Sequence, residues 1–378
     1  MNVHITLVGG QPAPVYHGIV ATHPDRVVYV YSHDSSKELA AIRAEVAIQE
    51  DEYPALDPID IYEITDRAKE LAERYRDDEV TVNISGGTKA WTFIFGITFQ
   101  SMPNAHVIYF DQNNVLWDYR DMSHRDDFQF DMDALFRLHG NPLERYRSYN
   151  EYDEADVDVV RQIESIINFQ RKHFLSLTTV LNKDWSNRLV QQNAGTFVLP
   201  DSPSFVEWEK GQYARLVLYH NKRGVLDTLF RSPHAVELLF NSGWFEFKVA
   251  RILHGWEYAQ EIRLNCIFPP KSDRSERRFR FPKNEIDIIV NTGRKILFVE
   301  CKTHINSSND IDKFKNAVNN YGGRASKALF VTNTRMDDKQ IEKCRESGIV
   351  PFFLEGGGLA KEQELYGILD RLILKINA

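Results

Sequence analysis

The sequence predicts a two-domain α/β protein, and three observations support this fold class. The chain has 378 residues, which suits two domains at roughly 100–200 residues each. About the first 120 residues alternate short apolar runs with stretches of helical periodicity, as in a parallel sheet flanked by helices. The same alternation returns after Ser232. We therefore expect one domain over residues 1–145, a linker and the N-terminal part of the second domain over 146–235, and the core of the second domain over 236–378.

In the first domain, β-rich and helical runs follow each other without an internal repeat. We expect strands at Val3–Val8, Val27–Tyr31, Ile59–Ile61, Val80–Ile84 and His106–Phe110. The spacing of apolar residues predicts helices at Ser36–Ile48, Asp66–Tyr75 and Lys89–Gln100, with Asp66 as an N-terminal cap. This order of elements predicts a Rossmann-like sheet.

The composition changes after Leu138. Acidic residues gather within Asn150–Asp158, which is typical of a solvated linker and a helix N-terminus, and a helical run continues to about Leu181. Residues 182–232 show no pattern from which we can predict helices or strands. Up to about residue 219 they contain prolines and several aromatic residues. The elements expected beyond Ser232 are helices at Trp244–His254, Ile311–Tyr321 and Glu362–Ile376, and strands at Glu261–Phe268, Glu285–Asn291, Lys295–Cys301, Ala328–Thr332 and Ile349–Leu354. These strands predict a hairpin followed by a crossover.

Composition and charge exclude several classes of protein. Hydrophobic residues make up 43% of the chain and aromatic residues 12%, so a disordered chain is excluded. No run approaches the roughly 18 apolar residues of a membrane span, and the N-terminus lacks the basic and apolar segments of a signal peptide. We expect a cytoplasmic protein. The three cysteines are too scattered for a disulfide framework or a cysteine zinc site, and the net charge of −8 argues against indiscriminate nucleic-acid binding outside a local basic groove.

The most informative segment of the second half is Asn284–Thr303. A turn signal at Asn291–Arg294 separates two β-rich runs and predicts a hairpin. Side chains alternate along a strand, so Glu300 and Lys302 share one face, and an ordinary register places Asp287 opposite them. Two carboxylates beside an ammonium suit phosphodiester cleavage, because oxygen ligands bind Mg²⁺ or Mn²⁺ while the lysine orients water and offsets charge. Cys301 would offer its backbone carbonyl to the metal. The alternative is a surface hairpin with an incidental salt bridge.

This arrangement resembles the PD-(D/E)xK nuclease superfamily, which carries an acid on one strand and an acid-x-Lys on the next. Here those residues are Asp287 and Glu300-Cys301-Lys302. The family often adds an acid from the preceding helix, and Glu246 in Asn241–Glu246 fits that place. The residue before Asp287 is isoleucine instead of the family's proline. The resemblance implies a restriction-endonuclease-like domain and a metal-dependent nuclease.

A basic segment precedes the predicted hairpin. It interleaves two phenylalanines with cations, which suits phosphates and the stacked bases of a single strand, although a flexible charged loop would read the same way. The candidate substrate contacts are Lys271, Arg274, Arg277, Arg278 and Arg280.

Two polar glycine turns follow strands of the first domain. Asn83–Lys89 lies between a strand and a helix, and Gly9, Gly10 and Gln11 follow the first strand. In a doubly wound sheet both turns open on the same carboxyl edge, where backbone N–H groups and short side chains bind anions. Neither turn has a dinucleotide or triphosphate fingerprint, and two simple tight turns remain the alternative. The candidate ligand contacts here are Gly9, Gly10, Gln11, Ser32, Ser85, Gly86, Gly87, Thr88 and Lys89.

These turns resemble the CARF domain, the CRISPR-associated Rossmann-like sensor of cyclic oligoadenylates, whose late strand ends in a Gly-Gly-Thr-Lys loop like Gly86–Lys89. The resemblance covers about Met1–Leu138 and implies a homodimer that holds the activator across its twofold axis. A CARF sensor joined to a PD-(D/E)xK nuclease is a layout of type III CRISPR immunity. It implies a nuclease that cyclic tetra-adenylate activates and that cuts single-stranded DNA or nicks duplex DNA, with single-stranded RNA as a further candidate substrate. Two alternatives remain: a restriction-like nuclease regulated by another nucleotide, and a non-catalytic nucleotide sensor.

Overall fold

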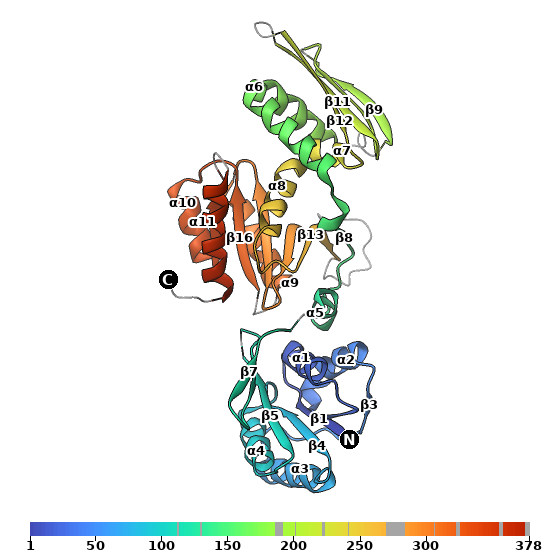
Figure 1. Cartoon of the computed structure of the whole chain (residues 1–378), viewed down its shortest axis with the longest axis vertical. Helices are drawn as coiled ribbons and strands as arrows, with labels where there is room; N and C mark the ends of the chain where they lie inside the picture. Colours follow the sequence, from blue (N-terminus) through green and yellow to red (C-terminus); the bar gives the residue numbers. More distant parts are fainter. Residues whose placement is uncertain are drawn as a thin grey trace.

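A computed structural model describes residues 1–374, apart from residues 112, 129–130, 186–191, 201, 221–223, 241, 270–283, 306, 323–325 and 355–357. Figure 1 shows three bodies stacked along the long axis of the molecule, with the N-terminal sheet at one end, the C-terminal sheet in the middle and a smaller helix-and-sheet body at the other end. Among the residues that the structure describes, no helix combines the length and the apolar character needed to cross a bilayer.

The N-terminal sheet has the order β3-β2-β1-β4-β5-β6-β7. Its strands are β1 (Asn2–Leu7), β2 (Arg26–Val30), β3 (Gln49–Glu50), β4 (Glu79–Asn83), β5 (Ala105–Phe110), β6 (Leu116–Asp118) and β7 (Ser123–Arg125), and its helices are α1 (Pro12–Thr22), α2 (Ser36–Glu45), α3 (Ile61–Arg74) and α4 (Lys89–Gln100). Strands β1 to β5 pair in parallel. The expected Rossmann-like sheet is confirmed, and its strand order reverses between β1 and β4, where open α/β sheets bind ligands.

Two predictions in this domain are wrong. Ile59–Ile61 is not a strand, and Asp66 lies inside α3 instead of capping it. The cap is Asp60, whose Oδ1 accepts hydrogen bonds from the backbone nitrogens of Tyr62 (2.9 Å) and Glu63 (3.2 Å). The two isoleucines resembled a buried strand, but both are exposed. Helix α1 was not predicted, because its residues are apolar on most sides and show little periodicity.

Helix α5 (Met132–Leu138) joins the two domains. Met132 and Phe136 pack into the core of the C-terminal sheet, whereas Ala134 and Leu138 pack against α1 and α2. Each contact also includes an ion pair: Arg137 of α5 pairs with Glu45 of α2, and Asp133 of α5 pairs with the buried Arg263 of β13. The domain boundary is thus a shared helix.

The C-terminal sheet has the order β17-β16-β15-β14-β13-β8. Its strands are β8 (Arg145–Ser148), β13 (Glu261–Phe268), β14 (Asn284–Asn291), β15 (Ile296–Lys302), β16 (Lys327–Thr332) and β17 (Ile349–Phe353), and its helices are α8 (Gly243–His254), α9 (Asn309–Tyr321), α10 (Asp338–Glu346) and α11 (Leu359–Leu369). Strands β14 and β15 form the expected antiparallel hairpin, and β15 to β17 are parallel. Helix α10 was not predicted, and the last helix ends in a π-helical turn at Asp370–Leu374.

The region that the sequence left unorganised is a helix and an antiparallel sheet. Helix α6 (Glu154–Trp185) leads into the strands β9 (Ala194–Val198), β10 (Phe205–Glu209), β11 (Tyr213–His220) and β12 (Gly224–Arg231), and the short helix α7 (Ala235–Leu239) follows. Buried Trp208 and Phe230 of this sheet belong to the same apolar core as Ile288 and Val299 of the C-terminal sheet. The inserted sheet therefore packs on the second domain.

Candidate active site and sensor pocket

The hairpin of β14 and β15 brings Asp287, Glu300 and Lys302 together. The two strands pair as far as Ile288 and Val299, so the register carries Asp287 opposite Glu300. Where the ladder ends, Asp287 Oδ2 takes the place of a strand partner and accepts a hydrogen bond of 2.7 Å from the backbone nitrogen of Cys301. The ammonium of Lys302 lies 2.5 Å from Glu300 Oε1 and 3.4 Å from Asp287 Oδ2.

Glu246 reaches the same place from helix α8. The helix begins with Ser242, whose φ of 66° is left-handed, and Gly243, where a Cβ atom would lie 2.2 Å from the carbonyl oxygen of Glu237. These two residues set the start of α8 and place Glu246 in its first turn. Glu246 lines the same cavity as Asp287 and Lys302, and the charge of Asp287 helps to raise the pKa of the Glu246 carboxyl, so we group the four predicted side chains as one cluster.

Burial and mutual repulsion shape the charges of this cluster. Burial, then the charge of Asp287, raises the pKa of Glu300 to about 8, and the same two causes raise the pKa of Glu246 well above its usual range. Burial works against the charged form of Lys302, but Asp287 and Glu300 outweigh it and raise the pKa of that ammonium. One lysine therefore does not compensate three ionised carboxyl groups, and without a metal ion Glu246 and Glu300 keep their protons more readily than usual.

Cys301 points into the core on the other side of the strand. Its side chain is 2% exposed and packs among apolar residues. Burial raises the pKa of the Cys301 thiol well above its usual value, so its sulfur stays protonated. Its backbone nitrogen donates to Asp287 in the cluster, and a metal-binding role of its carbonyl oxygen stays a prediction.

The cluster opens into a cavity of about 760 Å³. Glu246, Asp287 and Lys302 line one part of it. The rest of its lining includes residues of the edge strand β8, Glu285 beside Asp287 on β14, Asn265 of β13, and Lys210 in the turn between β10 and β11. Asn265 stands opposite Asp287 with a left-handed φ of 52° and interrupts the ladder between β13 and β14. Backbone strain of this kind concentrates at functional sites.

Several residues of this lining were missed by the sequence reasoning. Arg145, Tyr146, Arg147 and Tyr152 line the cavity, and Lys210 joins them from the inserted sheet. The run Arg145-Tyr146-Arg147 was a detectable signal, because it interleaves cations with an aromatic residue, but its strand pairs with β13 more than a hundred residues away. The basic residues that were predicted as substrate contacts, Lys271, Arg274, Arg277, Arg278 and Arg280, lie outside the described residues.

The donor set of the cluster fits a hard divalent cation. Asp287, Glu300 and Glu246 offer carboxylate oxygens, which Mg²⁺ and Mn²⁺ prefer, and the excess of carboxylates over Lys302 would be offset by such an ion. Among the described residues no three His, Cys, Asp or Glu side chains are already gathered as a metal site. Lys302 lies between two of the carboxylates, so its ammonium would have to withdraw from one of them.

In the N-terminal domain, the two predicted glycine turns meet at the carboxyl edge of the sheet, after β1 and β4. A Cβ atom on Gly9 would lie 2.7 Å from the backbone nitrogen of Gly87, and one on Gly86 would lie 2.1 Å from the carbonyl oxygen of Leu7. Gly87 has a left-handed φ of 75°. Glycine is therefore required at these positions by the close approach of the two backbones. Gly10 has open space around its Cα atom.

The polar side chains of these turns have different surroundings. Thr88 caps α4, accepting from Trp91 N, and also donates to the carbonyl oxygen of Pro58. Ser85 Oγ donates to Asn83 Oδ1 (2.6 Å) and accepts from Phe110 N. Ser32 is buried and bonds within its own turn to Ser35. Lys89, at the first position of α4, and Gln11 are exposed.

Comparison with known proteins supports this picture of the first domain. Residues 3–133 match the family model described as the Card1 CARF domain. The N-terminal domain is a CARF domain. No curated protein matches the sequence of the whole chain.

Solved structures share the fold over the full length. Can2 from Sulfobacillus thermosulfidooxidans, solved with cyclic tetra-adenylate, aligns with a TM-score of 0.66 at 16% identity over 100% of both chains. Protein VC1899 from Vibrio cholerae aligns with a TM-score of 0.69 at 15% identity over 99% of this chain and 97% of its own. A type III CRISPR defence DNA nuclease activated by cyclic oligoadenylate aligns with a TM-score of 0.57 at 18% identity, over 98% of this chain but 51% of its own. The arrangement of CARF domain, second sheet and inserted sheet is thus a shared fold.

Proposed function

We propose that this protein is a metal-dependent nuclease of type III CRISPR defence that cyclic oligoadenylate activates. The observation that carries the proposal is the cluster of Glu246, Asp287, Glu300 and Lys302 on a hairpin beside a cavity, in a chain whose first domain is a CARF domain. Similarity to Can2 and to the CRISPR DNA nuclease supports it, although both are under 20% identical and share only the fold. The second domain would be a PD-(D/E)xK nuclease.

The catalytic roles follow from the chemistry of the cluster. Asp287, Glu300 and the carbonyl of Cys301, with Glu246 as a further ligand, would hold Mn²⁺ or Mg²⁺. When bound, that ion supplies Lewis-acid stabilisation of the attacked phosphate. Lys302 would then turn from Glu300 towards the substrate, where its ammonium orients the attacking water and stabilises charge on the phosphoryl oxygens.

The cavity favours a single nucleic-acid strand as the substrate. Arg145, Arg147 and Lys210 supply cations for the backbone. Tyr146 is exposed, and with Arg263 over one face of its ring it would offer the other face to a base, whereas the ring of Tyr152 already packs against Phe247 and His234. Arg147 pairs with Glu151 and Glu237, whereas Arg145 and Lys210 are exposed. Single-stranded DNA, or duplex DNA that the enzyme nicks, is the proposed substrate, with single-stranded RNA as the second candidate. From the sequence alone, Arg277, Arg278 and Arg280 stay further candidate substrate contacts.

The activator is proposed to be cyclic tetra-adenylate, on the strength of the CARF match and of the ligand in the Can2 structure. Backbone N–H groups of Gly9, Gly86 and Gly87 lie where the strand order of the sheet reverses, and the first turn of α4 adds the positive end of a helix. Lys89 supplies an exposed cation beside them.

A homodimer is proposed from an apolar surface next to these turns. Five large apolar side chains of α3, α4 and the loop before α3 are at least half exposed: Ile59, Ile61, Tyr62, Phe93 and Ile97. The Gly86–Lys89 turn borders this surface, because Thr88 and Trp91 bond to the backbone of Asp57 and Pro58. A second copy seated there would bring two activator turns together, as a ring-shaped ligand requires.

One experiment tests the proposal. Purified protein is incubated with Mn²⁺ and labelled single-stranded DNA or RNA, with and without cyclic tetra-adenylate, beside Glu300→Ala. We expect cleavage only by the parent protein and only with activator and metal. Cleavage that needs no cyclic oligoadenylate would favour the restriction-like alternative, and no cleavage of any substrate, with binding of the ring intact, would favour the non-catalytic sensor.

A further inference from the structure

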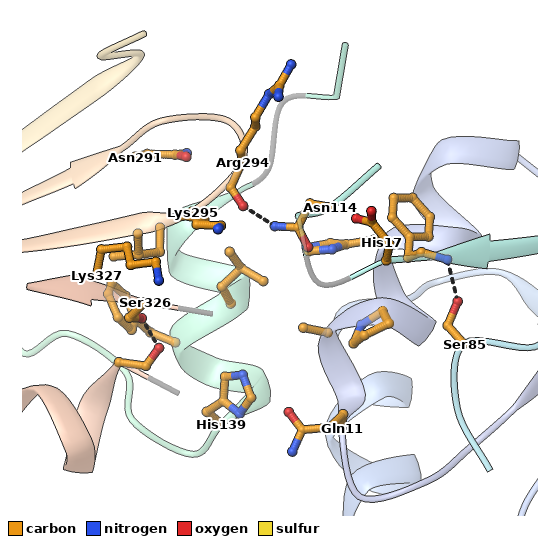
Figure 2. A pocket seen from close by; sticks show the side chains of 18 of the residues that line it. Gln11, His17, Ser85, Asn114, His139, Asn291, Arg294, Lys295, Ser326 and Lys327 are labelled. Carbon is orange, nitrogen blue, oxygen red and sulfur yellow. Dashed lines mark hydrogen bonds between the residues drawn. The ribbon is translucent and has the colours of Figure 1, made fainter. Parts of the chain in front are cut away.

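A cavity of about 500 Å³ lies between the CARF domain and the second domain. Figure 2 shows Lys295, Ser326 and Lys327 of the second domain on one side of it, and Gln11, His17 and Ser85 of the first domain on the other. Gln11 and Ser85 follow the ends of β1 and β4, and His17 lies in α1 with its ring 5.8 Å from that of Phe110 at the end of β5. The cavity therefore opens at the same carboxyl edge as the candidate activator turns.

Two lysines form the cationic wall. Lys295 directly precedes β15 and Lys327 begins β16, and these strands are neighbours in the sheet, with Leu297 opposite Lys327. Lys295 is only 5% exposed, and its Nζ lies 3.4 Å from Asn113 Oδ1, at the limit of a hydrogen bond. Lys327 is half-buried, and within the described part of the chain no carboxylate lies within 4.0 Å of its ammonium. Lys327 thus offers a cation that no described carboxylate neutralises, and an anion in the cavity would pair with it.

The rest of the cavity is built rigidly around these lysines. In the turn between β14 and β15, Thr292 Oγ1 accepts from Lys295 N and donates to its carbonyl oxygen, while Gly293 N donates to Asn291 Oδ1. In the loop after β5, Asp111 Oδ1 accepts from the backbone nitrogens of Asn113 and Val115.

The loop after β5 is also fastened to the turn. Asn114 Nδ2 donates to the carbonyl oxygen of Arg294, as Figure 2 shows, and the guanidinium of Arg294 pairs with Asp126. These bonds hold the two walls of the cavity in register, so the cavity is a formed site with one wall from each domain.

We propose that this cavity binds a phosphate group of a nucleotide, with Lys327 and Lys295 as its cations and Gln11 as a polar contact from the CARF domain. The volume is sufficient for a nucleotide. The activator ring is one source of the phosphate, and in that form the inference rests on the proposed function. A free nucleotide is the other source.

The position of the cavity gives such binding a consequence for the candidate active site. Lys295 directly precedes β15, and Glu300 on that strand is five residues further along, which is roughly 17 Å at 3.3–3.4 Å per residue. A phosphate held at the start of β15 would therefore act on the strand that carries Glu300 and Lys302, without contact with the substrate.

The test measures binding of cyclic tetra-adenylate and of ATP by calorimetry for the full-length parent protein, Lys327→Ala, Lys295→Gln and Lys339→Ala. Lys339 is an exposed lysine of α10 away from the cavity and serves as the matched control. Loss of a charged phosphate contact should weaken binding of one of the two ligands about tenfold or more in Lys327→Ala, while Lys339→Ala binds like the parent. Circular dichroism checks folding. If Lys295→Gln does not fold because Lys295 is buried, the binding affinities of Lys327→Ala alone test the proposal.

The outcomes separate the inference from the proposed function. Parent protein that binds the ring while Lys327→Ala binds both ligands within twofold of the parent would overturn the cavity site alone. Parent protein that does not bind the ring would overturn the sensor function, and Lys327-dependent binding of ATP would then still support the cavity. Binding of neither ligand by the parent would overturn both.

Discussion

The two candidate sites of this chain differ in the atoms that form them, which are backbone atoms in one and side chains in the other. In the CARF domain the site is backbone: Gly9, Gly86 and Gly87 allow two turns to approach within distances that a Cβ atom would forbid. In the second domain the site is side chains, with three carboxylates and Lys302 brought together against their own electrostatics. The candidate ligand site is thus formed by backbone atoms, whereas the candidate catalytic site is formed by charged side chains.

This difference indicates which kind of substitution should inactivate each site. A backbone site loses its function when atoms are added, because added atoms fill the space that the ligand needs. A cluster of buried charges loses its function when atoms or charges are removed, because each group has a chemical role. The four experiments below use this contrast.

The largest expected effect is on catalysis. Glu300→Ala removes a proposed metal ligand, and Lys302→Ala removes the cation beside it, so single-turnover cleavage should fall by roughly a thousandfold or more. Activator binding should be unchanged. Lys361→Ala is the control, since that lysine forms a surface ion pair with Glu364. Turnover near that of the parent in either variant would remove these residues from the chemistry.

The next effect concerns the activator turns. A Cβ atom on Gly87 would lie 2.9 Å from the Trp91 ring, at a left-handed φ, so Gly87→Val should weaken binding of cyclic tetra-adenylate by roughly tenfold or more. Lys89→Ala should weaken it by a similar factor through a lost charged contact. Gly367→Ala is the matched control, because Gly367 lies in α11 of the second domain and its added methyl group would meet only the Arg371 guanidinium, at 3.8 Å. Calorimetry on folded, dimeric protein measures all three, and unaltered affinity in Gly87→Val and Lys89→Ala would move the activator away from these turns.

The hairpin shows how much of the candidate site follows from sequence. A turn signal between two β-rich runs fixed the register, and the register alone placed Asp287 opposite Glu300. The helix Lys89–Gln100 and the strand Glu261–Phe268 were predicted with the observed bounds. The local sequence was sufficient for these elements because the turn and cap residues that delimit an element lie next to it in the chain.

The remaining errors come from information that is distant in the chain. Strand β8 contributes Arg145 to the cavity only because it pairs with β13, and no local pattern contains that pairing. Ile59 and Ile61 indicated a buried strand because an apolar pair has the same composition whether it is buried in a core or exposed, as it is here. The inserted sheet was missed for a similar reason, since its core is completed by the C-terminal sheet.

A smaller effect is expected on substrate binding. Arg145→Ala and Lys210→Ala should each lower the affinity for single-stranded DNA a few-fold and reduce the slope of log K against log salt by about 0.7. The triple replacement of Arg277, Arg278 and Arg280 by alanine should lower the slope by up to about 2. Arg161→Ala is the control, since Arg161 is paired with Asp158 on α6. Filter binding at several salt concentrations measures the slopes, and a slope unchanged by Lys210→Ala would separate the inserted sheet from substrate binding.

The smallest effect is on stability, and its sign follows from the pKa of Glu300. That pKa is about 8 in the folded protein against 4.5 in the unfolded chain, so between these values the folded state binds more protons and metal-free protein loses stability as the pH rises. Glu300→Gln removes this loss while Asp287 still pairs with Lys302. The Tm of the variant without metal should therefore exceed that of the parent by a few degrees at pH 8.5, and the gap should close towards pH 5.

Glu346→Gln, the control at an exposed position, should shift the Tm at neither pH. Mn²⁺ should raise the Tm of the parent but not of Glu300→Gln, since the parent alone keeps both strand carboxylates. A gap that does not depend on pH would mean that the carboxyl of Glu300 is not held under electrostatic strain, and the contrast between a backbone site and a charged cluster would then lose its energetic basis.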